Sequence, residues 1–120
     1  LIHALMDAML GAAGLRDIGY YFPPEDDQYK GISSMLLLEK VNFLLKERGL
    51  QAYNIDIMVI SETPKLKPHI DMMKANLQSI LEIPLDRISI KATTNEMLGA
   101  IGRREGIAAQ AVVSVYEGEI

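Results

Sequence analysis

The chain contains no cysteine. This absence excludes disulfides, thiolate metal ligands and a cysteine nucleophile, so a metal site would have to use His, Asp or Glu. The net charge is −4 and the longest Lys/Arg run is Arg103-Arg104, which excludes the basic footprint of a nucleic-acid-binding protein. No apolar run approaches the roughly 18 residues of a membrane span, and no segment resembles a signal peptide. These absences predict a cytoplasmic protein with no nucleic-acid and no membrane partner.

What is present suits one globular domain. Apolar residues make up 49% and charged residues 23% of the 120 positions, so residues 1–120 are expected to form a single domain. The first residue is Leu1 and not Met, and the segment 1–6 already has the pattern of an apolar helix without a cap. We therefore expect that further residues, including a strand, precede Leu1 in the protein.

The hydrophobic periodicity predicts an α+β order of elements. A helix is expected over 1–13 with Gly14 as its stop, then a long loop over 15–30, and then a helix between Gly31 and Gly49. Ser33 or Ser34 could cap this second helix, whose expected buried side is Met35, Leu38, Val41, Phe43, Leu44 and Leu45.

The second half of the chain alternates strands and helices. Residues 52–60 are apolar nearly throughout, which predicts a strand buried on both faces. A helix should begin near Pro68 and continue to Leu81, followed by a strand over 87–93, a loop with a short helix over 95–102, and a last strand over 107–115. The expected fold is a mixed β-sheet covered by helices, an α/β sandwich-like arrangement.

The segment 91–96 follows a strand and could bind phosphate. The hydroxyls of Thr93 and Thr94, with the free N–H groups of a helix start, would form a cradle for phosphate oxygens, and Glu96 could hold Mg²⁺ beside them. A simpler alternative is a threonine N-cap with Glu96 in a capping box. The spacing alone favours the capping box.

The two histidines support weaker hypotheses. His3 and Asp7 are four residues apart on one helix face, so Asp7 could orient His3 for a zinc ion, but zinc needs three or four ligands. A buried His3 bonded to Asp7 is the better interpretation from the sequence alone. For His69, next to Pro68 at a helix start, a structural or capping role is favoured.

Charged residues in two loops also allow alternatives. Asp17, Glu25, Asp26 and Asp27 could form a solvated loop or accept hydrogen bonds from sugar or diol hydroxyls. Arg103 and Glu105, between Gly102 and Gly106, are expected to form an exposed ion pair worth under ~1 kcal/mol.

In their order along the chain, short blocks of this sequence resemble the 2-C-methyl-D-erythritol 2,4-cyclodiphosphate synthase family. The blocks are His3-Ala4-Leu5 with Asp7-Ala8 and Gly11-Ala12-Ala13, Asp17-Ile18-Gly19 with Phe22-Pro23, Lys30-Gly31 with Ser34, Asn54 with Asp56, Pro64-Lys65 with Pro68-His69-Ile70, Lys91-Ala92-Thr93-Thr94 with Glu96, and Leu98-Gly99 with Gly102-Arg103 and Glu105-Gly106-Ile107-Ala108. They cover almost the whole chain, and the last two are specific.

The resemblance implies a metal-dependent enzyme of the non-mevalonate isoprenoid pathway in the bacterial cytoplasm. The substrate would be a cytidine-diphosphate-linked methylerythritol phosphate, cyclised by a phosphorus–oxygen lyase reaction that releases CMP. The family's fold is chorismate-mutase-like and forms a homotrimer, with each active site between neighbouring subunits. Its cofactors are Zn (or Mn) and Mg.

The resemblance also assigns roles to residues. His3 would be one of three protein ligands of zinc, Glu96 a magnesium ligand shared with substrate phosphates, and Thr94 the catalytic residue. The remaining expected substrate contacts are Asp17, Ile18, Gly19, Phe22, Pro23, Pro24, Glu25 and Asp26 on the methylerythritol side, Ser61, Glu62, Thr63, Pro64, Lys65, Leu66 and Lys67 around cytidine, Thr93, Thr94, Asn95 and Glu96 around the diphosphate, and Ala100 and Arg103.

Departures from the family pattern keep two alternatives open. The family's N-terminal Asp-x-His pair, which supplies the other zinc ligands, is not in this sequence; Pro24 stands where an Asp is usual, Ala100 where a Phe is usual, and Arg16 where a Gly is common. The alternatives are a non-catalytic trimeric nucleotide-binding module, and the C-terminal part of a bifunctional cytidylyltransferase/cyclodiphosphate synthase.

Overall fold

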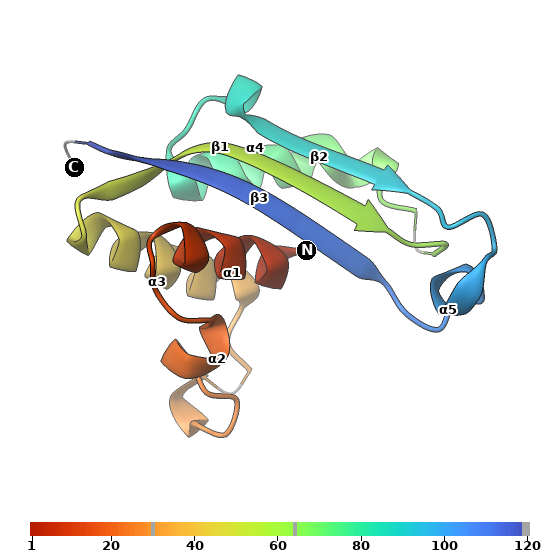
Figure 1. Cartoon of the computed structure of the whole chain (residues 1–120), viewed down its shortest axis with the longest axis horizontal. Coiled ribbons are helices and arrows are strands. Elements are labelled where there is room, and N and C mark those ends of the chain that lie inside the picture. The colour runs from red at the N-terminus through yellow and green to blue at the C-terminus, as the bar shows by residue number, and fades with distance from the viewer. Residues whose placement is uncertain (30, 64, 119–120) are drawn as a thin grey trace.

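The computed structural model describes residues 1–29, 31–63 and 65–118. In chain order the elements are α1 (Ile2–Ala12), α2 (Ile18–Tyr21), α3 (Ser34–Glu47), β1 (Leu50–Ile60), α4 (Ile70–Leu81), β2 (Ile88–Thr93), α5 (Gly99–Gly102) and β3 (Ala108–Glu117) (Figure 1). Short 3₁₀ turns span Asp27–Tyr29, Lys67–His69 and Leu85–Arg87. Among the described residues, none of the helices combines the length and apolarity that a bilayer span requires.

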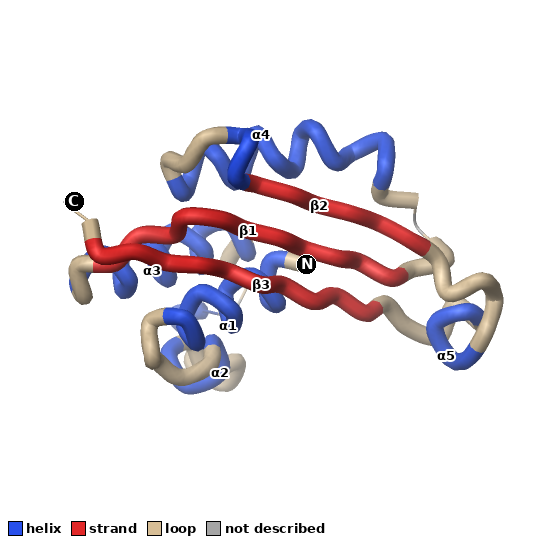
Figure 2. Tube along the Cα trace, turned by 45° about the horizontal axis from the view of Figure 1, so that its top comes forward, coloured by secondary structure: helices blue, strands red, loops and turns tan. Residues whose placement is uncertain are grey.

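The three strands form a mixed sheet in the order β2-β1-β3. β1 and β2 are parallel, with Ile60 opposite Thr93 at their carboxyl ends, whereas β1 and β3 are antiparallel. Helix α1 packs against β3, α3 against β1 and α4 against β2. Figure 2 shows these helices (blue) along the three-stranded sheet (red). The expected α+β fold with a mixed sheet covered by helices is confirmed.

The core lies between this sheet and the long helices. In α1 the apolar residues recur at helical spacing, so Leu5, Met6, Met9 and Leu10 are all withdrawn from solvent on one side of the helix. In β1 the side chains alternate between faces, so Ile55, Ile57 and Val59 meet the helices. The two periods together place the apolar stripes of helix and sheet against one another.

The expectation that strand 52–60 is buried on both faces is wrong for the single chain. Asp56 and Met58 alternate with the buried residues of β1, and they lie on the face that none of the helices in the described part of the chain covers. Asp56 pairs there with Lys91 of β2 at 3.0 Å, and Val112 of β3 is 72% exposed. The apolar residues of this open face misled the sequence-based prediction, because they are not buried by helices of their own chain.

The helices also differ in detail from the expectations. Of the two serines, Ser33 caps α3, with its Oγ accepting a hydrogen bond from the N–H of Met35 at 3.1 Å. Phe43 is not on the buried side of α3 but is 61% exposed. The segment 15–30 is not a continuous loop: Asp17 caps the short helix α2 by accepting from the N–H of Tyr20, and a 3₁₀ turn follows.

Replacement of Leu38 tests the helix–sheet core. Leu38 is 0% exposed, so Leu38→Ala should lower the free energy of unfolding by ~2–5 kcal/mol through lost burial and a residual cavity. Leu36, on the same helix and 50% exposed, provides the matched control: Leu36→Ala should change it by less than ~0.5 kcal/mol. Urea unfolding measures both, and equal losses would show that α3 does not pack as described.

Candidate functional site

The parallel pairing of β1 and β2 creates the principal candidate site. Parallel strands end at the same edge of a sheet, and the loops beyond their carboxyl ends commonly form ligand sites. Here the segment after β1 and the end of β2 enclose an open pocket of about 210 Å³. It is lined by Ser61, Glu62, Lys65, Leu66, Lys67, Ala92, Thr93 and Thr94. The structure therefore brings Thr93 and Thr94, predicted around the diphosphate, to the same pocket as five of the residues predicted around cytidine, whereas Thr63, Asn95 and Glu96 do not line it.

Backbone and hydroxyl groups hold the two sides of the pocket together. The N–H of Ser61 donates to the carbonyl of Thr93 at 3.0 Å, which extends the strand pairing into the pocket. The buried Ser61 hydroxyl donates to the carbonyl of Thr63 at 2.7 Å and so fixes the first bend of the segment. Pro64, another predicted cytidine contact, lies outside the described residues.

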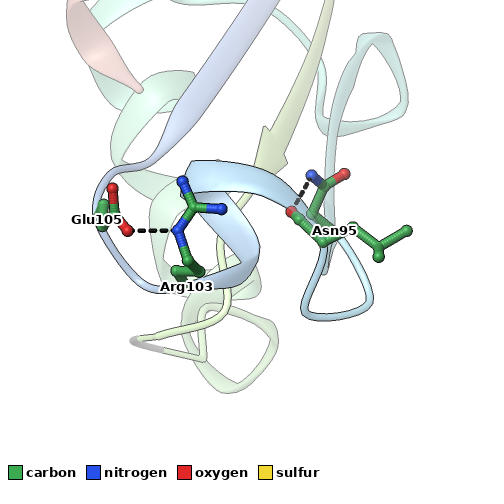
Figure 3. Close-up of polar contacts among 4 residues, drawn as sticks. Asn95, Arg103 and Glu105 are labelled. Carbon is green, nitrogen blue, oxygen red and sulfur yellow. Dashed lines mark hydrogen bonds and ion pairs between the residues drawn. The ribbon is translucent and has the colours of Figure 1, made fainter.

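The turn after β2 has an unusual backbone. Glu96 and Met97 have φ angles of 53° and 61°, in the left-handed region, which costs about 1–2 kcal/mol for each non-glycine residue. The Asn95 side-chain amide donates to the carbonyl of Leu98 at 2.8 Å (Figure 3). The Glu62 carboxylate accepts from the N–H of Asn95 at 2.7 Å and from that of Met97 at 3.2 Å. These bonds offset the cost of the turn.

This geometry excludes the capping-box interpretation of Thr93–Glu96. The Thr94 hydroxyl accepts from the N–H of Glu96 at 3.3 Å within a turn, whereas the N-cap of the next helix, α5, is Leu98. The N–H groups of Asn95 and Met97 are also not free for a phosphate, because Glu62 occupies them. Of the predicted phosphate cradle, the residues Thr93 and Thr94 line the pocket, and the Thr93 hydroxyl donates to the Thr94 carbonyl at 3.4 Å.

His3 and Asp7 do not form the expected buried pair. His3 is exposed, because positions 3 and 7 lie away from the core stripe of α1. Asp7 instead accepts a hydrogen bond from the N–H of Ile18 at 2.9 Å, and this bond connects the start of α2 to α1. No cluster of three His, Asp or Glu able to hold a metal is found among residues 1–29, 31–63 and 65–118. His3 therefore offers one free ligand and not a complete site.

The predicted methylerythritol residues lie apart from the pocket. Asp17 caps α2, and both oxygens of Asp26 bond to Gln28, so these carboxylates support their own loop. Phe22 packs edge-on against Tyr29 with a centroid distance of 5.2 Å, beside α3. None of the residues Asp17, Ile18, Gly19, Phe22, Pro23, Pro24, Glu25 and Asp26 lines the pocket at the strand ends.

The segment around α5 forms a compact bend behind the turn. The Arg103 Nε donates to Glu105 Oε2 at 2.5 Å, and both side chains are largely exposed, which confirms the expected ion pair (Figure 3). Ala100 is exposed and does not line the pocket. His69 occupies the N-cap position of α4, but its side chain makes no capping hydrogen bond, so its capping role is not supported.

The fold and the pocket define a class of protein: an α+β domain with an open pocket at the carboxyl ends of two parallel strands. Residues 1–116 match the YgbB family. The chain therefore belongs to the YgbB family, which is a family of enzymes.

Named relatives agree with this assignment. The chain is 57% identical over 113 residues to the 2-C-methyl-D-erythritol 2,4-cyclodiphosphate synthase of Nostoc punctiforme, with 94% of this chain and 71% of the relative covered. The bifunctional IspDF of Campylobacter jejuni superposes with a TM-score of 0.91 at 44% identity, and the match covers 96% of this chain but 31% of that one. IspF of Plasmodium falciparum in complex with CDP gives a TM-score of 0.85 at 30% identity, with 98% and 70% covered.

Two structural ties were missed by the sequence analysis. Glu62 was expected to contact substrate, yet its carboxylate reaches a turn 33 residues further along the chain. Asp7 was expected to bond His3, yet it bonds the backbone of Ile18. No local spacing signals either contact, because each depends on how distant elements dock.

Gly102 should be essential for the bend. A Cβ atom at this position would lie 2.1 Å from the carbonyl carbon of Met97, so Gly102→Ala must displace the turn. We expect a lower melting temperature and altered amide resonances at 95–98. Gly106→Ala is the matched control, because a Cβ there meets nothing within 4 Å. An unperturbed Gly102→Ala protein would refute this close approach.

Proposed function

We propose that the chain carries the activity of a 2-C-methyl-D-erythritol 2,4-cyclodiphosphate synthase in the non-mevalonate isoprenoid pathway. The 2-phosphate oxygen of the cytidine-diphosphate-linked methylerythritol attacks the β-phosphorus. One P–O bond forms, the P–O bond to CMP breaks, and CMP leaves with that oxygen and its electron pair. The product is the 2,4-cyclodiphosphate.

One observation carries this proposal: in a YgbB-family chain, Thr93 and Thr94 line the same pocket as Ser61, Glu62, Lys65, Leu66 and Lys67. An enzyme that cleaves a cytidine diphosphate between its two phosphates needs a nucleotide-binding segment next to a phosphate-binding turn. The CDP complex of the Plasmodium falciparum relative fits a nucleotide ligand.

The residues of the pocket suit phosphoryl transfer, in which a protein mainly positions the reacting groups and neutralises charge. The backbone of Ser61–Lys67 would hold cytosine, since few of these side chains present groups that match a base edge. The ammonium groups of Lys65 and Lys67 add positive charge beside the phosphates. The Thr94 hydroxyl would donate to a phosphoryl oxygen as charge develops there.

Metal ions are part of the proposal. Glu96 has the hard oxygen ligands that Mg²⁺ prefers, and His3 suits zinc or manganese as one ligand of several. Such ions, when bound, would neutralise phosphate charge and polarise the attacked phosphorus. The exposure of His3 leaves its imidazole accessible for this role.

The active assembly is proposed to be a cytoplasmic homotrimer. Two features fit such an assembly: the open sheet face, with Val112 exposed, and the separation of Phe22 and its neighbours from the pocket. A neighbouring subunit could then supply the methylerythritol side. The likeness to the bifunctional IspDF of Campylobacter jejuni also fits an origin within a fused enzyme.

Replacement of Glu96 tests the function. Glu96→Gln should abolish Mg²⁺-dependent CMP release from the cytidine-diphosphate-linked substrate and leave the melting temperature unchanged, because the carboxylate is exposed and its loss removes a metal ligand. Glu82→Gln is the matched control, since Glu82 is also an exposed carboxylate with a left-handed backbone, at φ 57°. Retained turnover with a large loss of stability would assign Glu96 to the fold alone.

A further inference from the structure

Glu62 connects the two halves of the pocket. It is the second residue after β1 and lines the pocket, but both of its carboxylate oxygens accept hydrogen bonds from backbone N–H groups. Oε2 accepts from the N–H of Asn95 at 2.7 Å, and Oε1 accepts from the N–H of Met97 at 3.2 Å. One side chain thus bridges two amides that flank Glu96.

This bridge determines where Glu96 stands. With its neighbours Asn95 and Met97 fixed, and with its own N–H donated to the Thr94 hydroxyl at 3.3 Å, the residue has little freedom. Its left-handed backbone, and that of Met97, would relax if the amides were released, because this conformation is intrinsically disfavoured in L-residues. Release would displace both the Glu96 carboxylate and the Thr94 hydroxyl.

A carboxylate is the side chain that this position requires. Two N–H donors converge on it, and only a carboxylate presents two acceptor oxygens, whereas a glutamine amide has one acceptor oxygen and an NH₂ group that can only donate. The bonds are also charge-assisted, which strengthens them.

We propose that Glu62 is a positioning residue, which holds the turn bearing Thr94 and Glu96 in its reactive geometry and couples it to the nucleotide segment 61–67. The coupling arises because Ser61, next to Glu62, is itself bonded to the Thr93 carbonyl at 3.0 Å. A nucleotide that orders segment 61–67 also orders the turn. This assignment rests on the proposed function for its effect on catalysis, but not for the bridge itself.

The experiment compares Glu62→Gln, Glu62→Ala and a distant control in the full protein. Glu117→Gln makes the same charge change at the opposite end of β1, where Glu117 faces Leu50. CMP release would be followed over ranges of substrate and Mg²⁺, CMP affinity by titration, and protection of the amides of Asn95 and Met97 by hydrogen exchange.

We expect kcat to fall about 100-fold in Glu62→Ala, the loss associated with misplacement of reacting groups by about 1 Å, and less in Glu62→Gln. CMP affinity should change less than threefold, exchange at Asn95 and Met97 should accelerate, and Glu117→Gln should match the unmodified protein. The kcat effect without loss of CMP affinity separates positioning from substrate contact.

Three outcomes would overturn the inference: unchanged exchange at Asn95 and Met97, unchanged kcat, or a loss of CMP affinity as large as the loss of kcat. Failure of the proposed function gives a different result, because the unmodified protein would then release no CMP from the substrate. In that event the exchange measurement alone would still decide whether Glu62 holds the turn.

Discussion

The parallel pairing of β1 and β2 is the constraint on which the rest of the structure depends. Ile60 and Thr93 stand opposite each other at the carboxyl ends, so segments more than thirty residues apart leave the sheet side by side. Without that register, Ser61 could not bond Thr93, and Glu62 could not reach the turn at Asn95. The helices α3 and α4 secure the register by covering β1 and β2 with apolar side chains on one face.

The site then combines a regular scaffold with a strained connection. The strands provide rigidity, whereas the turn at Glu96 and Met97 adopts a backbone that L-residues disfavour. Such a strained backbone persists only where surrounding contacts hold it in place, and it is common at functional sites. Here the supporting contacts are the Glu62 carboxylate and the absence of a side chain at Gly102, which lets the backbone of α5 approach Met97.

The sequence predicted what short-range periodicity determines and failed where distant elements meet. Helical spacing located α1, α3 and α4, and β-branched residues located the strands and therefore the mixed sheet. The same apolar pattern gave no sign that Val112 is exposed, because periodicity does not reveal whether a sheet face is covered by helices of the same chain. For the site, the family resemblance identified the two segments that line the pocket. The hydrogen bonds of Glu62 and Asp7 could not be predicted, because they depend on how distant elements pack in the folded chain.

We propose that the pocket at the strand ends binds a cytidine nucleotide through the backbone of segment 61–67. The most direct measurement is amide chemical-shift mapping of the isotope-labelled protein during titration with CMP and, separately, with UMP. CMP should shift the amides of residues 61–67 and 93–97 at lower concentrations than UMP, because fixed backbone donors and acceptors match the cytosine edge and not the uracil edge. Equal responses to both nucleotides, or shifts confined to residues 17–26, would contradict it.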